Sequence, residues 1–577
     1  MIEASVVLAT YNRADQLRRC LDALARQTQA TTDYEVVVVD DGSSDGTAEF
    51  LATYRPPFAL RVIHQPNAGQ CAALNRGVTE AQGRICIFLD DDVVVSPRFV
   101  AEHLRPHRER NDVVGIGQMT LTLPAQAGWF ARAFGREWRE HYAGLNEGRE
   151  PTWRDCYGGN MSVDRAICLA VGGFDASLRR AYDIELAYRL ERHGCSFAYL
   201  PEALGDQDDR KALRALIADS GRSGAACVDL YRRYPATLPD LLGGFGEQRL
   251  SIAAALRALL VFDLSPERLE PLGWLIAKCG RPDTAYDLLQ RYSFWRSVRR
   301  ALGDDAGWEA LTGGTPVLMY HAFAASEEEA SRYVIPIHRF EAQMAWLKRR
   351  GYRVLSLGEY LHYRREFRLP PHRSVVITID DGYADALSLA YPVLRHYGYP
   401  ATVFLSSAMV GRTGPHDGDR ALAGRAALTW AEARAMLQGG IEIGAHGRTH
   451  PDLTSISLDR AAEEVAGSRK DLERELGGPV EAFSYPYGKH SPAMRSIVRQ
   501  AGFICGCGTD NGRNTPVTSP YALRRVEIHG TDSLIHFAVA LRYGCRPRVL
   551  WRLVREALGA KNPTVPVARP AFRMVER

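Results

Sequence analysis

Short apolar runs alternate with amphipathic segments along the first 210 residues of the chain. Four apolar runs, each followed by polar residues, cover residues 5–8, 34–39, 61–64 and 84–89. The segments between them repeat apolar residues at helical spacing, which predicts helices that bury one face. Buried strands that alternate with helices predict an α/β domain with a parallel sheet covered on both faces. Ligands of such sheets bind at the carboxyl ends of the strands, where the polar clusters fall.

Helical periodicity without recognisable motifs marks the middle of the chain. Four amphipathic segments cover residues 211–234, 248–262, 266–278 and 283–302. We therefore predict a helical connector, without chemistry of its own, that packs two catalytic domains together. The predicted parts are a first domain over residues 1–210, the connector over 211–312, a second domain over 313–545 and a basic tail over 546–577.

A stripe of aromatic residues lies inside the first domain. Trp129 or Phe130, Phe134 and Trp138 recur on one face of a predicted helix. Such a stripe is typical of a helix that faces the core. An acceptor-binding lid or a shallow membrane contact is the alternative.

Two predicted strands of the second domain end in residues that bind divalent ions. A β-branched run ends at Asp380 and Asp381. A shorter strand over 441–443 is followed by His446 and His450. If the chain turns helically there, the i, i+4 spacing points both imidazoles the same way. One carboxylate and two neutral imidazoles form a three-ligand site that leaves a position for water, which predicts metal-dependent catalysis.

Residues 315–545 resemble the polysaccharide deacetylase domain (NodB homology, carbohydrate esterase family 4). The matching motifs are Met319-Tyr-His321, Thr378-Ile-Asp-Asp-Gly382, His446-x-x-x-His450 and Phe483-Ser-Tyr-Pro-Tyr-Gly488. The resemblance implies a distorted (β/α) barrel with its site at the carboxyl ends of the strands. It also implies that Asp380 is the catalytic base and that a divalent metal such as Zn²⁺ or Co²⁺ is held by Asp381, His446 and His450.

Two positions depart from the deacetylase pattern. The family motif Phe-Arg-x-Pro-Tyr is here Phe483-Ser-Tyr-Pro-Tyr487, so Ser484 replaces the arginine that orients the base. The catalytic acid, a late histidine in the family, has no unmistakable counterpart. His529 is the candidate, and His321 is the alternative.

Residues 1–210 resemble a family 2 glycosyltransferase of the GT-A fold. The matching motifs, in the expected order, are Ala9-Thr-Tyr-Asn12, Asp40-Asp-Gly-Ser-Ser-Asp45, Asn67-Ala-Gly69, Asp90-Asp-Asp92 and Gly172-Gly-Phe-Asp175, followed by Asp183. The resemblance implies a nucleotide-sugar donor, favoured as a UDP-sugar, and a carbohydrate or glycoside acceptor. A hard cation such as Mg²⁺ or Mn²⁺, held by carboxylate and diphosphate oxygens, can neutralise the charge of the leaving group.

The resemblance also assigns roles within the first domain. Asp92 is the expected metal ligand, and Asp90 and Asp91 are expected near the ribose and the diphosphate. Asp41 is expected to accept the uracil N–H. The remaining expected donor-site residues are Ala9, Thr10 and Tyr11 around the base and ribose, and Asn67 and Gly69 of their motif.

The resemblance makes Asp183 the base that deprotonates the acceptor hydroxyl. Family members usually have Glu-Asp here, whereas this chain has Tyr182-Asp183, so Glu185 is the fallback. The alternative is that Asp183 only caps a helix. Where many relatives have a metal-binding histidine the chain reads Gly205-Asp-Gln-Asp-Asp209, so Asp206 replaces that ligand or the ligand is absent.

Composition limits the partners and the compartment. The net charge is +4, and without a basic, aromatic-interleaved repeat it argues against nucleic acid. Eleven cysteines without framework spacing suit reduced thiols. The sequence opens on a strand rather than a signal peptide, and no apolar run is long enough to span a bilayer, so we expect a cytoplasmic enzyme. The tail after residue 545 predicts a basic helix that packs on the domain or contacts a membrane peripherally.

Together these features predict a bifunctional enzyme. We expect the first domain to transfer an N-acetylated sugar with inversion, UDP-N-acetylglucosamine being the favoured donor. The second domain then hydrolyses the N-acetyl group, because the fusion makes the product of one site a substrate for the other. The alternatives are halves that act on different parts of one glycan with a donor lacking the acetamide, or one half kept as a degenerate carbohydrate-binding scaffold. The acceptor and the oligomeric state are left open.

Overall fold

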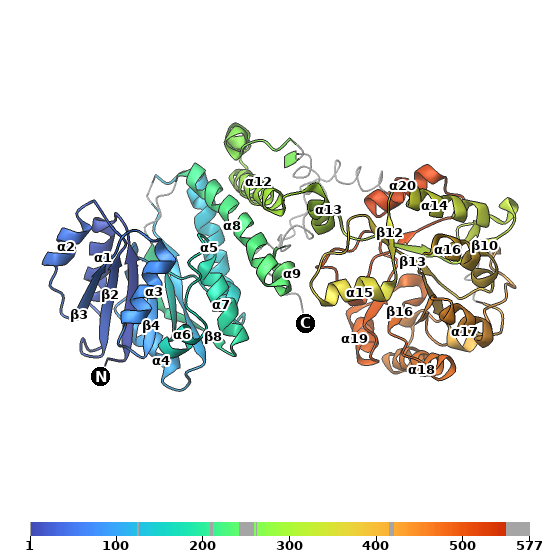
Figure 1. Ribbon diagram of the computed structural model, residues 1–577, viewed down its shortest axis with the longest axis horizontal. Coiled ribbons are helices and arrows are strands. Elements are labelled where there is room, and N and C mark those ends of the chain that lie inside the picture. Colours follow the sequence, from blue (N-terminus) through green and yellow to red (C-terminus); the bar gives the residue numbers. More distant parts are fainter. Residues whose placement is uncertain are drawn as a thin grey trace. The chain divides into compact units, whose positions relative to one another are not determined.

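The computed structural model describes residues 2–123, 126–207, 212–241, 259–260, 262–414 and 420–549. These residues divide between two compact units, one from Met1–Leu230 and Ala255–Ala301, the other from Tyr231–Ala254 and Leu302–Arg577. Each unit contains its own sheet with flanking helices, which confirms the predicted α/β class (Figure 1). Most of the basic tail, most of the predicted helix 248–262, and Asp208 and Asp209 lie outside the described residues.

The sheet of the first unit has eight strands in the order β3-β2-β1-β4-β7-β6-β8-β5. The strands are β1 (Ala4–Thr10), β2 (Tyr34–Asp40), β3 (Ala59–His64), β4 (Ile85–Leu89), β5 (Val93–Val95), β6 (Val113–Leu121), β7 (Asn160–Asp164) and β8 (Ser196–Gln207). β1 to β4 run parallel, so their carboxyl ends meet at one edge. β7 is antiparallel to both β4 and β6, and the sheet is therefore mixed rather than wholly parallel.

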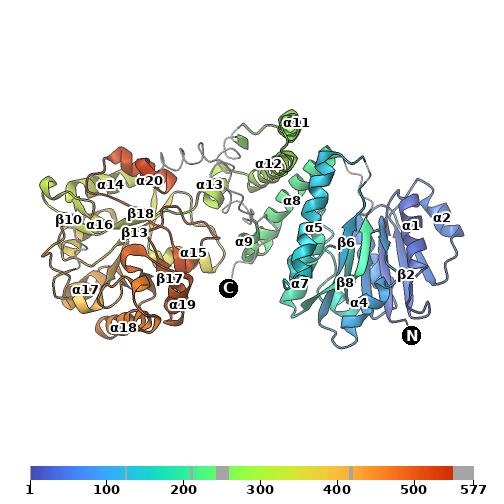
Figure 2. The ribbon, with the colours of Figure 1, turned by 180° about the vertical axis from the view of Figure 1, so that it is seen from behind.

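Helices cover both faces of this sheet (Figures 1 and 2). Helix α1 (Ala14–Leu24) buries Leu17, Leu21 and Leu24 against the strands, because their spacing places them on one face. The other helices that lie wholly or mainly in this unit are α2 (Thr47–Thr53), α3 (Gln70–Glu80), α4 (Phe99–His107), α5 (Trp129–Asn146), α6 (Arg165–Ala170), α7 (Tyr182–Arg192), α8 (Leu213–Arg233), α11 (Glu270–Lys278) and α12 (Pro282–Leu302).

The aromatic stripe of α5 faces other helices. Trp129, Phe130 and Phe134 pack against a small cluster that includes Leu216 of α8 and Tyr286 of α12. This packing agrees with the core-facing interpretation of the stripe. Because α8 and α12 belong to the predicted connector, the same packing attaches these two helices to the first unit.

Two buried histidines of α4 are neutral in the folded state. His103 Nε2 lies 2.7 Å from Asn160 Oδ1, and His107 Nε2 lies 3.0 Å from Ser162 Oγ. Burial lowers the pKa of His103 to about 4 and that of His107 to about 3, from an ordinary value of 6.5. In the unfolded chain both imidazoles would take up a proton below pH 6.5.

We therefore expect acid to destabilise the first unit. Between pH 7 and pH 5 its free energy of unfolding should fall by about 2 kcal/mol per imidazole, because the unfolded chain binds protons that the folded state excludes. Calorimetric scans of the full chain at the two pH values measure this change. A first-unit transition that does not move would contradict the prediction.

The second unit contains a parallel sheet with the strand order β17-β16-β15-β14-β13-β9-β18, and β12 also pairs with β13. The strands are β9 (Val317–Tyr320), β12 (Arg353–Leu355), β13 (Ser374–Ile379), β14 (Thr402–Leu405), β15 (Glu442–Ala445), β16 (Ala482–Ser484), β17 (Cys505–Cys507) and β18 (Val526–Glu527). A short parallel pair, β10 (Ala322–Ala324) and β11 (Val334–Pro336), lies apart. The sheet forms a parallel half-barrel of the kind that the resemblance implied.

Helices surround this half-barrel (Figure 1). Helix α18 (Leu458–Leu476) has clear signals at both ends, since Ser457 caps its start with a hydrogen bond from the Arg460 N–H and Gly477 ends it with left-handed φ. No helix within the described ranges is long and apolar enough to cross a membrane. The helices of this unit are α9 (Leu238–Leu241), α13 (Asp305–Gly313), α14 (Ile337–Arg349), α15 (Leu357–Arg365), α16 (Tyr391–Tyr397), α17 (Trp430–Gln438), α18 (Leu458–Leu476), α19 (Pro492–Gln500) and α20 (Leu534–Tyr543).

Candidate active sites

The second unit brings one carboxylate and two imidazoles together at the carboxyl ends of its strands. Asp381 follows β13, whereas His446 and His450 follow β15. One ligand atom from each side chain lies within 4.8 Å of the others, and all three residues are buried. The Nε2 atoms of His446 and His450 lie 3.5 and 3.4 Å from Asp381 Oδ1. The fold thus assembles the three predicted ligands.

Left-handed backbone conformations, rather than a helical turn, aim these side chains. Residues 446–450 form a loop, so the helical turn considered for the two histidines is absent from this part of the structure. Instead φ is 76° at Gly447 and 59° at His450, and the centroids of the two imidazole rings lie 4.8 Å apart. Asp381 has a φ of 70°. Non-glycine residues rarely adopt this region, and such strain concentrates at functional sites.

Hydrogen bonding orients the His446 ring so that Nε2 faces Asp381. Its Nδ1 lies 2.7 Å from the Ser484 carbonyl oxygen, to which it can only donate. Nε2, which lies 3.5 Å from Asp381 Oδ1, is then the nitrogen left to bind a metal, as in metal-binding histidines whose other ring N–H is anchored. Burial alone would raise the pKa of Asp381, but the neighbouring imidazoles bring it below its ordinary value. These three donors fit a divalent ion such as Zn²⁺.

Asp380 is held by an arginine that no sequence motif indicated. The fully buried Arg525 donates from Nη1 to Asp380 Oδ1 and from Nη2 to Asp380 Oδ2, both at 2.7 Å. Its Nη2 also donates to Ser484 Oγ at 2.9 Å, and its Nε donates to the Gly508 carbonyl at 2.8 Å. Ser484 stands where the family motif has arginine. The chain therefore supplies a guanidinium to Asp380 from the residue before β18 instead.

This ion pair controls the charge of Asp380. Burial alone would raise the pKa of the carboxyl, but the charge of Arg525, with those of His446 and His321, holds it well below its usual range. The bidentate geometry also fixes the orientation of both carboxylate oxygens. Asp380 is therefore ionised and rigidly oriented beside the ligand triad.

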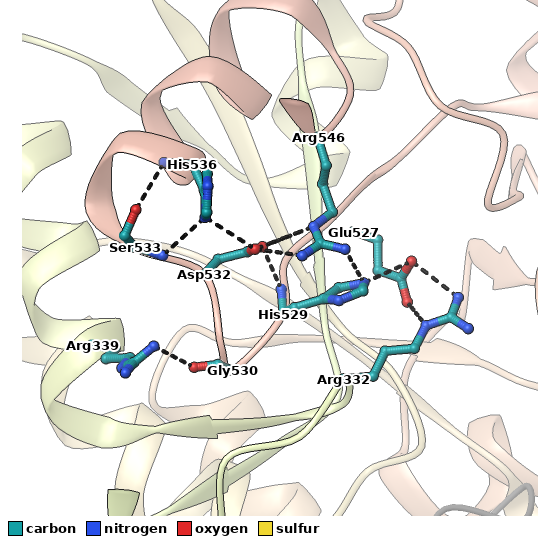
Figure 3. Close-up of polar contacts among 9 residues, drawn as sticks. All are labelled: Arg332, Arg339, Glu527, His529, Gly530, Asp532, Ser533, His536 and Arg546. Atoms are coloured by element: carbon teal, nitrogen blue, oxygen red, sulfur yellow. Dashed lines mark hydrogen bonds and ion pairs between the residues drawn. The ribbon is translucent and has the colours of Figure 1, made fainter. Parts of the chain in front are cut away.

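His529 lies in a separate polar network (Figure 3). Its Nε2 lies 3.2 Å from Glu527 Oε2 and 3.3 Å from Arg546 Nη1, and its backbone N–H donates to Asp532 Oδ2 at 3.0 Å. Arg546 also pairs with Asp532 at 2.6 Å. Among the residues that the structure describes, these polar contacts link His529 to its own network and not to the ligand triad.

His321, the alternative acid, lies after β9 and acts on the carboxylate pair. Its charge contributes to lowering the pKa of both Asp380 and Asp381. Its Nδ1 is buried and has no hydrogen-bond partner within the described ranges. The ring packs edge-on against Tyr333, with centroids 4.7 Å apart. The geometry therefore favours His321 over His529 as the imidazole beside the site.

In the first unit, three consecutive carboxylates after β4 meet residues from the ends of β1 and β8. Thr10 Oγ1 donates to Asp91 Oδ2 at 2.7 Å, and Gln207 Nε2 donates to Asp92 Oδ1 at 3.0 Å. Arg13 Nη1 bridges Asp91 Oδ1 at 2.9 Å and Asp92 Oδ2 at 3.2 Å. Sequence reasoning missed Arg13 and Gln207, because neither residue type by itself marks a site.

Burial and charge repulsion both act on Asp90. Burial raises its pKa to about 7, with further contributions from Asp92, Asp91 and Asp183. A bound cation would relieve that repulsion and restore the charged form. Carboxylate oxygens are the ligands that Mg²⁺ and Mn²⁺ prefer. The donor types therefore suit a divalent cation, but among the described residues these carboxylates do not gather their ligand atoms as closely as the triad of the second unit does.

Asp41 anchors the loop before α3. Its Oδ1 accepts from Gln65 Nε2 at 2.7 Å and from the Ala68 N–H at 2.8 Å, and its Oδ2 accepts from the Gly69 N–H at 2.8 Å. Asn67 is exposed on the same loop. A uracil N–H would therefore share an oxygen that is already hydrogen-bonded.

The three predicted base-lining residues at the end of β1 differ in exposure. Ala9 packs with Val37 and Val39, and Thr10 is buried against Asp91. Tyr11 is 49% exposed at the same edge of the sheet. Of these three residues, Tyr11 therefore has the side chain that is open to a ligand.

Asp183 lies in the first turn of α7 and faces a glycine loop. Its Oδ2 accepts from the Gly158 N–H at 2.9 Å, and its Oδ1 accepts from the Ile184 N–H at 2.9 Å. The N-cap position belongs to Ala181, which has a left-handed φ of 57°. Asp183 also contributes to the raised pKa of Asp90. The structure thus brings the expected base into the electrostatic reach of the carboxylate cluster.

The two fallback acids of the first unit are engaged in other contacts. The buried Glu185 accepts two hydrogen bonds from Arg189, at 2.7 and 2.6 Å. Asp206 accepts from the hydroxyls of Thr120, at 2.6 Å, and Thr122. Its neighbour Gln207 is the residue of this segment that reaches Asp92.

Comparison with known proteins finds a different family in each half of the chain. Residues 5–171 match the family "Glycosyl transferase family 2", and residues 368–505 match the family "Polysaccharide deacetylase". The "Validoxylamine A glucosyltransferase" of Streptomyces hygroscopicus subsp. jinggangensis (strain 5008) is 30% identical over 265 residues, which cover 41% of this chain and 62% of that protein. This chain therefore spans less than two thirds of that relative.

Two relatives match the second unit. The "Putative polysaccharide deacetylase YxkH" of Bacillus subtilis (strain 168) is 30% identical over 213 residues, which cover 37% of this chain and 71% of that protein. The "Poly-beta-1,6-N-acetyl-D-glucosamine N-deacetylase" of Staphylococcus aureus (strain MSSA476) is 29% identical over 218 residues, which cover 36% of this chain and 71% of that protein. In its C-terminal part the chain belongs to the polysaccharide deacetylase family, and its N-terminal part is similar to glycosyl transferase family 2.

Proposed function

We propose that the chain is a bifunctional enzyme. It transfers an N-acetylated sugar, with UDP-N-acetylglucosamine as the favoured donor, to an acceptor hydroxyl with inversion, and it hydrolyses the N-acetyl group of that sugar. The observation that carries the proposal is the buried triad of Asp381, His446 and His450 beside the oriented Asp380. That site lies in one chain with a glycosyltransferase unit, and an acetamido sugar is a substrate that suits both.

The deacetylase chemistry divides among residues with distinct roles. A divalent ion held by the triad would supply Lewis acidity toward the acetamide carbonyl and acidify the attacking water. Asp380 accepts the proton of that water, since Arg525 keeps it ionised and oriented. By the family resemblance, the Tyr487 N–H would donate to the carbonyl oxygen as negative charge develops. An imidazole then protonates the departing amine, and the unpartnered Nδ1 supports His321 for this role.

The transfer chemistry needs a base and a site for the diphosphate. Asp183 accepts the proton of the acceptor hydroxyl, which attacks the anomeric carbon from the face opposite the leaving group and inverts it. The hydrogen bond from Gly158 orients that carboxylate. A divalent cation at Asp90, Asp91 and Asp92 would offset the charge of the departing diphosphate. Arg13, which reaches two of these carboxylates, is a further cation within this cluster.

A relative's substrate supports the acetamide assignment. The matched Staphylococcus aureus enzyme is named for removing N-acetyl groups from poly-β-1,6-N-acetylglucosamine. A second candidate function follows from the Streptomyces relative, whose name specifies glucosyl transfer. In that alternative the first unit transfers a sugar without an acetamide, and the two units act on different parts of one glycan.

The test is a coupled assay with the full chain, a panel of acceptors and Mn²⁺. UDP release from UDP-N-acetylglucosamine followed by acetate release supports the proposal. UDP release from UDP-glucose alone favours the second candidate. Asp183→Asn should slow UDP release by about a hundredfold, because it removes the base but keeps the side-chain shape. Acetate release from a preformed acetylated oligosaccharide should be unchanged in that variant. Normal UDP release by Asp183→Asn would rule out the assigned base.

A further inference from the structure

One face of α5 carries three arginines that no assigned role explains. Arg132, Arg136 and Arg139 recur at i, i+4 and i+7, so they share a side of the helix. They line a cavity of about 370 Å³ together with Leu123, Trp129, Pro282 and Asp283. Asp283 pairs with Arg136, so three positive charges face one negative charge in this cavity.

Several donors in the cavity have no acceptor. The Trp129 indole N–H and the Arg136 Nε–H are buried and lack a hydrogen-bond partner within the described ranges, and the buried Asp283 Oδ1 contacts Arg136 as an ion pair only. Ion pairs of the Arg132 and Arg139 side chains are likewise absent among the residues that the structure describes. Buried donors normally have a partner, and leaving one unpaired is unfavourable. The cavity thus has the donor excess and the charge of a site for anionic oxygens.

The cavity lies beside the proposed transfer site. Leu121, two residues before Leu123, is in register with Gln207, which contacts Asp92. On α5 itself, Trp138 donates to the Met119 carbonyl of β6 at 3.0 Å and packs against Tyr157, with ring centroids 5.0 Å apart. Tyr157 adjoins Gly158, which holds Asp183. One helix therefore connects the cavity to both the metal-binding cluster and the expected base.

An exposed apolar surface adjoins the cavity. Trp274 of α11 packs edge-on against Trp129, with ring centroids 5.5 Å apart. Gly273 of the same helix faces Leu289 of α12, where a Cβ would clash at 2.6 Å. With that side packed, Leu272, Trp274 and Leu275 are left 39%, 42% and 60% exposed. Figure 2 shows α11 and α12 beside one end of α5.

We propose that this cavity is the acceptor subsite of the transfer reaction and binds a phosphate group that the acceptor carries on a hydrocarbon chain. The inference rests on the proposed function of the first unit. The guanidiniums supply bidentate donors for phosphate oxygens. The exposed residues of α11 supply an apolar surface for the chain next to the phosphate, which is why we assign an amphiphilic acceptor rather than a free sugar phosphate.

The test is co-sedimentation of the full chain with lipid vesicles. Vesicles of phosphatidylcholine that contain phosphatidic acid present a phosphate monoester on hydrocarbon chains, and vesicles of phosphatidylcholine alone are the reference. The wild-type chain should bind the first and not the second. The double variant Arg132→Gln/Arg139→Gln should bind at least about tenfold more weakly. Leu275→Ser should weaken vesicle binding but leave the binding of glucose 1-phosphate, a soluble phosphate monoester, unchanged. Arg108→Gln, at an exposed arginine after α4, is the matched control and should bind like the wild type.

The outcomes separate this inference from the proposed function. Equal vesicle binding by the wild type and the double variant overturns the subsite. Binding of glucose 1-phosphate without binding to phosphatidic acid vesicles overturns the assignment of a hydrocarbon chain. Donor hydrolysis to UDP without any acceptor should be the same in the wild type and the double variant, because the cavity contacts the acceptor alone. If no donor yields UDP, the proposed transfer fails, while the vesicle result still decides what the cavity binds.

Discussion

Replacing Asp381 by asparagine is expected to slow acetate release by more than about a thousandfold, because the loss of the charged ligand forfeits several kcal/mol of metal-dependent stabilisation. Asparagine keeps the shape of the side chain, so the two imidazoles stay in place while the negative charge is lost. Bound metal per chain should fall in the same variant, and elemental analysis after gel filtration measures it. UDP release should be unaffected, since the first unit has its own carboxylate cluster.

A matched control and a metal experiment sharpen this prediction. Asp459→Asn changes an exposed carboxylate at the start of α18 and should preserve both metal content and acetate release. A chelator should abolish acetate release by the wild type, and added Zn²⁺ or Co²⁺ should restore it. Full acetate release by Asp381→Asn, or by metal-free wild type, would exclude the triad as a catalytic metal site.

The triad could be predicted from sequence because each of its residues directly follows a strand that short sequence patterns identify. Asp381 is fixed by the end of a β-branched strand, and His446 and His450 lie within five residues of each other after a second strand. The helical turn that we considered for residues 446–450 is wrong. The two imidazole rings still converge, because the left-handed φ of Gly447 and His450 directs them to the same place. Residue types and strand ends thus identified the ligands without the correct backbone conformation.

Other parts of the sites depend on contacts between distant segments. Arg525 reaches Asp380 across 145 positions of the chain, and Gln207 reaches Asp92 across 115. From the sequence, an arginine before a short strand cannot be distinguished from a solvated surface arginine. Its role becomes visible in the structure, where the half-barrel places β18 beside β9. The antiparallel β7 was missed for a related reason, because strand–helix alternation does not specify the direction of each strand.

Moving the buried arginine from position 525 to position 484 is expected to separate its catalytic role from its structural one. Arg525→Ser leaves Asp380 buried without its guanidinium, which should cost about 3–5 kcal/mol of stability and slow acetate release by about a thousandfold. Ser484→Arg alone puts a second guanidinium where Arg525 Nη2 already lies 2.9 Å from Ser484 Oγ, so it should also be destabilising. The double variant restores one guanidinium beside Asp380, now from the position that the family motif uses.

The sign of the coupling free energy between the substitutions at positions 484 and 525 decides how Arg525 acts on Asp380. If Arg525 acts by holding Asp380, the double variant should regain most of the turnover rate and of the unfolding free energy, so the two changes are strongly non-additive. The loss in Arg525→Ser should lie mainly in kcat rather than KM, because the pair orients the base and does not bind the sugar. Arg524→Ser, at the exposed neighbouring position, controls for disturbance of the segment before β18 and should keep normal turnover. The double variant could also regain stability but not turnover. A guanidinium at position 484 would then not replace the one at position 525, and Arg525 would act through its contact with the Gly508 carbonyl as well as through Asp380.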